Sequence, residues 1–305
     1  MHRIVVGTRG SMLARWQATF IANALRTAHP GLEVEEKIIV TEGDRISAGP
    51  LWNAGGKGLW VKEIEAALLA REIDLAVHSM KDVPGELAPG LDIAAIPERA
   101  DVRDAVVSGK RQDLADLPRA ARVGTTSLRR AFQVKSIRAD LDVQILRGNL
   151  DTRLRKVAEG VVDAAILACA GLDRLGFADR ITERLSIERM LPAVGQGALA
   201  VEIRADAERV RDLCRGINHE TTAIAVTAER AFLARLGATC RTPVAGHAQV
   251  QDGTVVLLGR IGSPDGARVL ADQASGGCAA AADVGRGLAE AMLAHGAGEL
   301  LSASV

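Results

Sequence analysis

The stretch IDLAVHSMKDVP, residues 73–84, decides how the chain is expected to fold. Its first five residues form a short apolar run, typical of a strand that is covered on both faces of a sheet, and Pro84 prevents that strand from continuing. Ser79, Lys81 and Asp82 are therefore expected at the carboxyl edge of a parallel sheet, where open α/β folds bind ligands. The plainer alternative is a solvated Lys81–Asp82 turn pair, which this stretch alone does not exclude.

A pattern of strand, turn and helix occurs at the start of the chain and again near its middle. VVGTRGS, residues 5–11, ends a strand and predicts a helix capped by Ser11, and VGTTSLRR, residues 123–130, repeats the Val-Gly-Thr, the Ser and the helix. A second echo relates residues 163–167 to residues 74–77. Two similar α/β lobes, each presenting a strand-to-helix turn across a cleft, account for both echoes. Such turns point backbone N–H groups at a ligand.

Arginine dominates the basic residues, since the 38 consist of seven Lys and 31 Arg. Arginine binds carboxylates and phosphates bidentately, which suits an anionic ligand, but codon bias is the main cause of the excess. Only the placement of individual arginines therefore indicates function. Arginines at helix starts are unfavourable with the helix dipole, so a cluster there favours a ligand. The arginines so placed are Arg129, Arg130, Arg147, Arg153 and Arg174, and Arg9 adds a cation in the first turn.

Composition excludes several classes of protein. Four Phe, three Trp, no Tyr and a net charge of zero argue against a nucleic-acid partner. No apolar run approaches the length of a membrane span, and the chain begins directly in a strand without a leader, so a cytoplasmic protein without a membrane partner is expected. The four Cys have neither metal-ligand nor disulfide spacing, so no metal is expected. No coiled-coil pattern suggests an obligate partner, and a monomer is expected.

The sequence predicts three domains. The first α/β lobe is discontinuous and comprises residues 1–98 and 193–216, because a strand after the second lobe is suited to return to the first. The second α/β lobe comprises residues 103–190. A small α+β domain, residues 219–305, has a helix followed by alternating strands with Asp-Gly turns. The glycine-rich connection 42–58 suggests a mobile flap.

Cys240 lies in a loop at a helix exit, whereas Cys169 and Cys214 lie in apolar periodic runs. A thiol in a loop can react, while a core thiol usually only packs. Taken alone, Cys240 is better interpreted as an inert small residue. The sequence contains no convincing Ser-His-Asp or Cys-His pair, which argues against acyl transfer. His78, beside Ser79, is interpreted as a structural strand-end histidine rather than as a base.

Several spaced motifs together resemble the porphobilinogen deaminase (hydroxymethylbilane synthase) family, in the family's order and across nearly the whole chain. They are TRGS at 8–11, GKGL at 56–59, HSMKDVP at 78–84, GTTSLRR at 124–130, LRGN at 146–149 with TRL at 152–154, VGQGAL at 194–199, and Cys240-x-x-Pro243. The resemblance implies two lobes similar to those of type II periplasmic binding proteins, and a third, small α+β domain that carries a cofactor cysteine.

The resemblance also implies a reaction. Cys240 would hold a dipyrromethane cofactor through a thioether, and porphobilinogen would be deaminated and added to it. Four additions build a linear tetrapyrrole, which water releases as hydroxymethylbilane. Loss of ammonia leaves a cation that a carboxylate stabilises, and Asp82 matches the catalytic position.

Every pyrrole ring carries an acetate and a propionate, so the family's ligands need many cationic partners. By position, the residues for the cofactor are Lys81, Ser127, Arg129 and Arg130, with Asp82. The residues for the substrate or the growing chain are Arg9, Ser11, Ser79, Arg147, Arg153, Arg174 and Gln196, and Lys57 would lie on the flap.

The chain departs from the family's pattern at two places. Gly10 and Met12 stand where members often have Gln and Pro, and Ala238-Thr239 stands where a second Gly often precedes the cysteine. Neither departure removes a charged or reactive group. A non-catalytic anion-binding protein is a competing interpretation that explains the arginines but leaves Cys240 without a role. A regulatory effector-binding domain is disfavoured because no helix-turn-helix precedes the first strand.

Overall fold

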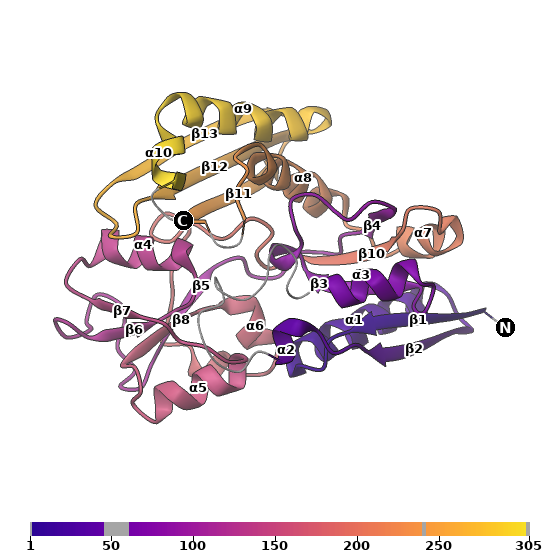
Figure 1. Ribbon diagram of the computed structural model, residues 1–305, viewed down its shortest axis with the longest axis horizontal. Coiled ribbons are helices and arrows are strands. Elements are labelled where there is room, and N and C mark those ends of the chain that lie inside the picture. Colours follow the sequence, from indigo (N-terminus) through magenta and orange to yellow (C-terminus); the bar gives the residue numbers. More distant parts are fainter. Residues whose placement is uncertain (1, 46–60, 240–241, 303–305) are drawn as a thin grey trace. The chain divides into compact units, whose positions relative to one another are not determined.

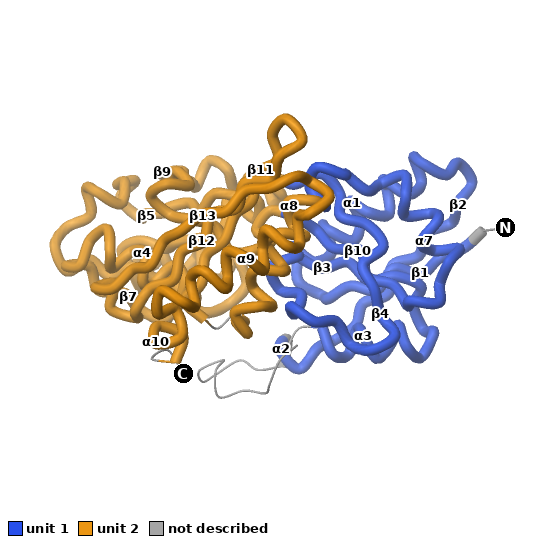
Figure 2. The backbone as a smooth tube through the Cα atoms, turned by 90° about the horizontal axis from the view of Figure 1, so that it is seen from above, with its two compact units in different colours: residues 1–99, 198–223 blue, residues 100–197, 224–305 orange. Residues whose placement is uncertain are grey.

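The structure is a computed structural model that describes residues 2–45, 61–239 and 242–302. The chain divides into two compact units, residues 1–99 with 198–223 and residues 100–197 with 224–305 (Figure 2). The three-domain division expected from the sequence stays a prediction. The predicted flap lies outside the described residues, except for residues 42–45.

The first unit is built on a mixed sheet of five strands in the order β2-β1-β3-β10-β4 (Figure 1). The strands are β1 (His2–Thr8), β2 (Leu32–Ile38), β3 (Leu75–Ser79), β4 (Leu91–Ala95) and β10 (Leu199–Arg204). The helical segments are α1 (Met12–Ala28), α2 (Glu42–Arg45), α3 (Lys62–Leu69), the 3-10 turn η2 (Met80–Asp82) and α7 (Glu208–Arg215).

The prediction of a parallel sheet at residues 73–84 is wrong on one side of the strand. β3 is parallel to β1 but antiparallel to β10, and β10 follows the second lobe in the sequence. β3 also extends to Ser79, because Leu199 and Ala200 of β10 pair with Ser79 and His78. His78 and Ser79 are therefore strand residues, not residues of the turn that follows.

Both faces of this sheet are covered, as the apolar run predicted. Leu75 and Val77 face a core that includes Ile21 and Leu25 of α1. Ala76 lies between them in the strand and faces a second core with Leu68 of α3. Successive residues of a strand point to opposite faces, so an uninterrupted apolar run is what two covered faces require.

The second unit contains a mixed sheet in the order β7-β6-β8-β5-β9. The strands are β5 (Asp104–Ser108), β6 (Arg122–Gly124), β7 (Asp142–Gln144), β8 (Ala164–Ala168) and β9 (Glu183–Arg184). The helices are α4 (Leu128–Ile137), α5 (Leu150–Ala158) and α6 (Cys169–Arg174), with a 3-10 turn η3 (Ala178–Arg180). In both sheets, three parallel strands are followed by one antiparallel strand and then by a strand that runs with the first three, which confirms the internal repeat.

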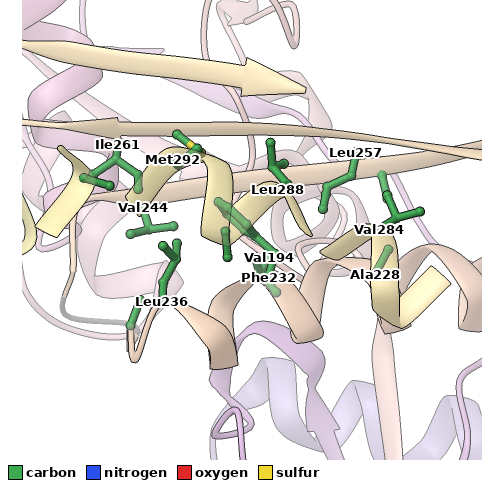
Figure 3. Close-up of a cluster of buried hydrophobic side chains, with 14 of the residues drawn as sticks. Val194, Ala228, Phe232, Leu236, Val244, Leu257, Ile261, Val284, Leu288 and Met292 are labelled. Atoms are coloured by element: carbon green, nitrogen blue, oxygen red, sulfur yellow. The ribbon is translucent and has the colours of Figure 1, made fainter. Parts of the chain in front are cut away.

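The C-terminal part of the second unit is a three-stranded antiparallel sheet covered by helices. Its elements are α8 (Glu220–Arg235), β11 (Val244–Gln251), β12 (Thr254–Gly262), β13 (Val269–Gly277), η4 (Cys278–Ala280), α9 (Ala281–Ala294) and α10 (Ala297–Ser302). Figure 3 shows Phe232 of α8 and Leu288 and Met292 of α9 in one apolar cluster with Leu257 of β12. The alternating strands predicted from residue 245 onward are confirmed, although the last strand is longer than expected.

Candidate active site

The turn between β1 and α1 is held by two hydroxyl groups. Ser11 caps α1, because its Oγ accepts a hydrogen bond of 3.2 Å from the N–H of Ala14. Thr8 is buried, and its Oγ1 donates to the carbonyl oxygen of Ala14 at 3.0 Å. These bonds orient the half-buried Arg9 between the strand and the helix. The predicted cap is thereby confirmed, and the turn that carries Arg9 is rigidly tied to the first turn of α1.

The end of β3 is tied to the same helix. Gln17 of α1 is buried, and its Nε2 donates to Ser79 Oγ at 2.8 Å. The N–H of Met80 donates to the carbonyl oxygen of Ala198, where β10 begins. Asp82 follows one turn later and is exposed. The strand end is thus fixed on two sides while the carboxylate stays accessible.

A pocket of about 430 Å³, which includes open solvent, lies in this part of the first unit. Arg9, Ser11, Ser79 and Asp82 all line it, although they come from residues 9–11 and 79–82. A guanidinium and a carboxylate thus share one small pocket with two hydroxyl groups. Lys81 is half-buried in the same 3-10 turn but is not among the residues that line the pocket.

In the second unit, a fully buried carboxylate joins the two adjacent arginines. Asp104 begins β5 and is 0% exposed. Its Oδ2 accepts a bond of 2.7 Å from Arg129 Nη1, and its Oδ1 accepts bonds from Arg130 Nε and Nη2 at 3.0 and 2.7 Å. Burial alone raises the pKa of Asp104, but the two guanidinium groups outweigh it and hold that pKa far below its ordinary value. Asp104 is therefore ionised at neutral pH.

The buried cluster of Arg129, Arg130 and Asp104 has two positive charges and one negative charge, so it carries one excess positive charge. Arg130 donates from Nε and Nη2 to Asp104 and from Nη1 to the carbonyl oxygen of Ile166. Arg129, by contrast, has a buried Nε that forms no hydrogen bond with any described residue. A buried cation needs a compensating anion, so the donor left over on Arg129 fits an anionic ligand. Ser127 caps α4 next to it, accepting from the N–H of Arg130 at 3.4 Å.

The other arginines predicted for the site occupy two further places in the second unit. Arg153 lies in α5 and donates through Nε to the carbonyl oxygen of Gly148, and Arg147 is half-buried just before that helix. Arg174 ends α6, and its Nη2 donates to the carbonyl oxygen of Gly197 at 2.7 Å. Burial lowers the pKa of Arg174 to about 10, so it stays cationic at neutral pH.

Gln196 is the predicted residue that joins the buried cluster most directly. Its Nε2 donates to the carbonyl oxygen of Val102 at 2.7 Å and to Asp104 Oδ1 at 3.0 Å. Its Oε1 accepts a longer contact of 3.5 Å from Arg129 Nη2. Gln196 therefore orients the carboxylate and one of the two guanidinium groups together.

The backbone beside Gln196 requires glycine. Gly197 has a φ of +86°, and a Cβ there would lie 2.5 Å from the carbonyl oxygen of Ala100. We expect Gly197→Ala to lower the free energy of unfolding by about 2–4 kcal/mol, since a left-handed residue costs about 1–2 kcal/mol and the clash adds to it. Gly160→Ala is the control, because Gly160 has a φ of +72° and nothing within 4 Å. Equal losses in urea titrations of the two variants would contradict a role for the close approach.

The cysteines fall into two groups. Cys169 and Cys214 are fully buried, and burial raises the pKa of each thiol to about 12, as suits core residues. Cys240 and Lys57 lie outside the described residues. Beside Cys240, the hydroxyl of Thr242 donates to the carbonyl oxygen of Thr239 at 2.6 Å and accepts from the N–H of Thr239 at 3.1 Å. Thr239 and Thr242, which flank the predicted cofactor cysteine in the sequence, are thus bonded to each other.

Sequence reasoning missed Asp104, Gln17 and Glu202, which hold predicted residues in place. Asp104 and Glu202 each stand in a mostly apolar strand whose every residue is buried. A charged residue in a strand of that kind needs a partner, and this was the signal available in the sequence. Nothing local identifies the partner, because Asp104 and Arg129 are 25 residues apart.

Among the residues that the structure describes, no group of three or more His, Cys, Asp or Glu is placed to hold a metal ion. Among the described helices, none is long and apolar enough to cross a membrane.

Two family models match the chain. Residues 4–212 match "Porphobilinogen deaminase, dipyromethane cofactor binding domain", and residues 223–294 match "Porphobilinogen deaminase, C-terminal domain". The chain is 50% identical to a porphobilinogen deaminase of Geobacter metallireducens, covering 97% of this chain and 93% of the relative. It is 48% identical to one of Syntrophobacter fumaroxidans, covering 98% and 96% of the two chains. Among solved structures, an arginine-specific periplasmic binding protein of Salmonella typhimurium is 13% identical, with a TM-score of 0.42 over 73% of this chain and 94% of that one.

Proposed function

Because this chain belongs to the porphobilinogen deaminase family, we propose that it deaminates porphobilinogen and joins four of the resulting units head to tail on a covalent dipyrromethane. Hydrolysis then releases hydroxymethylbilane, a precursor of haem and other tetrapyrroles. The enzyme is a transferase, and we place it in the cytoplasm as a monomer. The observation that carries the proposal is the pocket in which Arg9 and Asp82 come together from separate segments.

The residues of the second unit fit the family's cofactor. When bound, the dipyrromethane supplies a free pyrrole position that attacks the incoming unit. Its carboxylates need buried cations as partners. Arg129 is such a cation, because its cluster with Asp104 and Arg130 carries one excess positive charge and its Nε forms no hydrogen bond with a described residue. Cys240 would hold the cofactor through a thioether, and Lys81, Ser127 and Arg130 complete the set that the family pattern assigns to it. Arg130 donates three of its five N–H groups to Asp104 and Ile166, which leaves two for the cofactor.

Asp82 is the catalytic residue of the first unit. Departure of ammonia from the substrate leaves a cationic carbon conjugated to the pyrrole ring. An ionised carboxylate beside that ring stabilises the positive charge where it develops and accepts a hydrogen bond from the pyrrole N–H. Arg9 and the Ser11 and Ser79 hydroxyl groups line the same pocket and are suited to hold the acetate and propionate of the substrate.

The remaining arginines act on the carboxylates that accumulate as units are added. Each addition brings two further negative charges, so the cations for later units must differ from those for the first. Arg147 and Arg153, at the amino end of α5, and Arg174, whose lowered pKa still leaves it charged, fill that role with Gln196. Lys57 would contribute from the predicted flap.

The mass of the intact protein tests the proposal. We expect the purified protein to be heavier than its sequence by one covalently held dipyrrole, because the primer is attached before turnover. Cys240→Ser should have the plain sequence mass and no activity. Cys278→Ser, in which a half-buried thiol elsewhere in the same unit is removed, is the matched control and should keep the added mass. An active protein of plain sequence mass would rule out the covalent primer.

A further inference from the structure

A buried pair of ionisable side chains lies beside the Asp82 pocket. His78 Nε2 is 2.9 Å from Glu202 Oε2, and the two side chains are only 5% and 1% exposed. In the register of β3 and β10, Glu202 stands opposite Ala76, two residues before His78, so both side chains project from the same face of the sheet. His78 also lines the pocket that Asp82 lines. The pair therefore connects the covered interior of the sheet with the proposed active site.

Stability does not account for this pair. Replacing a buried ion pair by apolar residues is often neutral or stabilising. Glu202 Oε1 is moreover buried without a hydrogen bond to any described residue, a situation that costs about 1–3 kcal/mol. A buried polar group left unsatisfied in a native structure calls for an explanation, and a role at the adjoining pocket provides one.

The contact with Glu202 determines which ring nitrogen of His78 can accept a proton. A carboxylate only accepts hydrogen bonds, so Nε2 must be the donor, and in a neutral ring Nδ1 is then the acceptor. No described residue forms a hydrogen bond with Nδ1. A carboxylate that fixes one nitrogen of an imidazole and leaves the other able to take up a proton is the arrangement that serves general bases.

The proposed reaction needs such a base. When the new carbon–carbon bond forms, the attacking pyrrole carbon still carries its hydrogen, and this C–H bond must break in every addition. An ordinary imidazole both accepts and releases protons near neutral pH, whereas an ordinary carboxylate retains none there.

We propose that His78 takes up this proton at Nδ1 and that Glu202 is the positioning residue that holds its ring. The C–H bond breaks, its electron pair restores the aromatic pyrrole, and the proton forms an imidazolium paired with the Glu202 carboxylate. The proton then passes to solvent, where the departed ammonia is its final acceptor. The inference rests on the proposed function and adds a second group to Asp82.

Four other charged groups bear on the titration of this pair. Glu65 and Lys62 belong to α3, which covers the same face of the sheet, and Arg9 and Asp82 line the pocket. Burial raises the pKa of Glu65, and Glu202 raises it further, while His78 and Lys62 act in the opposite direction. Because the pKa of Glu65 is raised, a Glu65→Gln variant separates the contribution of Glu65 to a pH profile from that of His78.

The first test needs no variant. In holoenzyme labelled with ¹⁵N at histidine, with the His78 ring assigned through its bonds to the backbone, we expect at pH 8 a proton on Nε2 and none on Nδ1. A proton on Nδ1 would overturn the inference. Because the same sample turns over porphobilinogen and carries the covalent dipyrrole, this result would leave the proposed function standing. Absence of turnover and of added mass would instead contradict the function itself.

The second test is the pH profile of turnover between pH 5.5 and 9. His78→Gln is expected to lower kcat about 100-fold with KM changed less than about twofold, and to flatten the acid limb. Glu202→Gln should displace that limb, and Glu65→Gln should leave it in place. His247→Gln is the matched control, since His247 is also 5% exposed beside a buried Glu229, but in the other unit. A His78→Gln enzyme with the wild-type profile and rate would overturn the inference.

Discussion

Asp82→Asn is expected to lower kcat by about 10²–10³-fold, because the amide keeps the shape of the side chain but removes the charge that stabilises the cation left by ammonia. Asp82 is exposed, so the free energy of unfolding should change by no more than about 0.5 kcal/mol. The arginines that bind carboxylates are untouched, and KM should change far less than kcat. Steady-state turnover of porphobilinogen, with the product followed after oxidation to a coloured porphyrin, measures both.

Asp92→Asn is the control for Asp82. Asp92 carries the same charge in the same unit, but its side chain is half exposed and pairs with Arg211 at 2.9 Å, outside the pocket. Its loss should leave kcat within about twofold of the wild-type value, since exposed pairs contribute little. Turnover of Asp82→Asn close to that of the control would remove Asp82 from the catalytic role.

Asp104→Ala is expected to lower the free energy of unfolding by about 3–5 kcal/mol, because it leaves two guanidinium groups buried without their counter-ion. That is a large share of the 5–15 kcal/mol by which a domain is normally stable. Urea denaturation at pH 7 measures it. Asp163→Ala is the control, since Asp163 pairs with Arg122 with both side chains about 41% exposed, and less than about 1 kcal/mol should be lost. Equal losses in the two variants would contradict the burial argument.

The pH dependence of that difference follows from the direction of the shift. The pKa of Asp104 is lower in the folded than in the unfolded protein, so the folded state binds its proton less readily. Its contribution is therefore complete above the unfolded pKa of about 3.9 and is lost only as the pH falls through the lower, folded value. The difference between wild type and Asp104→Ala should accordingly stay constant from pH 5 to 8. A decline within that window would show that another group dominates.

Asp104→Asn addresses the ligand rather than stability. The amide retains one oxygen acceptor for Arg130 but loses the charge, so the buried cations gain a second unit of excess charge. If Arg129 Nε holds a cofactor carboxylate, this variant should retain the covalent dipyrrole in the intact mass. Asp104→Ala, in which neither guanidinium is oriented, should carry it in a smaller fraction of molecules.

Local features of the site were predictable because the interactions that form them are local. The Ser11 cap involves Ala14, three residues away, and the Ser127 cap involves Arg130 at the same spacing. The repeat of strand, turn and helix was predictable for the same reason. The three parallel strands β1, β2, β3 and β6, β7, β8 have the same order in their two sheets, with the first strand of each set between the other two. The positions of Cys240 and Lys57 in the site stay predictions, as do the roles of the individual arginines.

Pairing between distant parts of the chain determined the features that the sequence pattern did not predict. The strand predicted to end at residue 77 continues to Ser79, because β10 supplies hydrogen-bond partners from more than a hundred residues later in the chain. That extension makes His78 a paired residue within the strand, with its side chain hydrogen-bonded to Glu202. Its interpretation as a merely structural histidine rested on its neighbours in sequence, which do not include its partner in space.

Residues 73–84 show which features the sequence determined and which features only the tertiary structure decided. By itself, the sequence determined a covered strand that ends in a polar turn with Asp82, because alternation, proline and capping act over a few residues. Only the tertiary structure decided that Arg9 and Asp82 share a pocket, that Asp104 holds Arg129 and Arg130, and that Glu202 orients His78. The partner of a buried charge is a residue that the folded chain brings close to it, and that residue stands at no fixed spacing in the sequence.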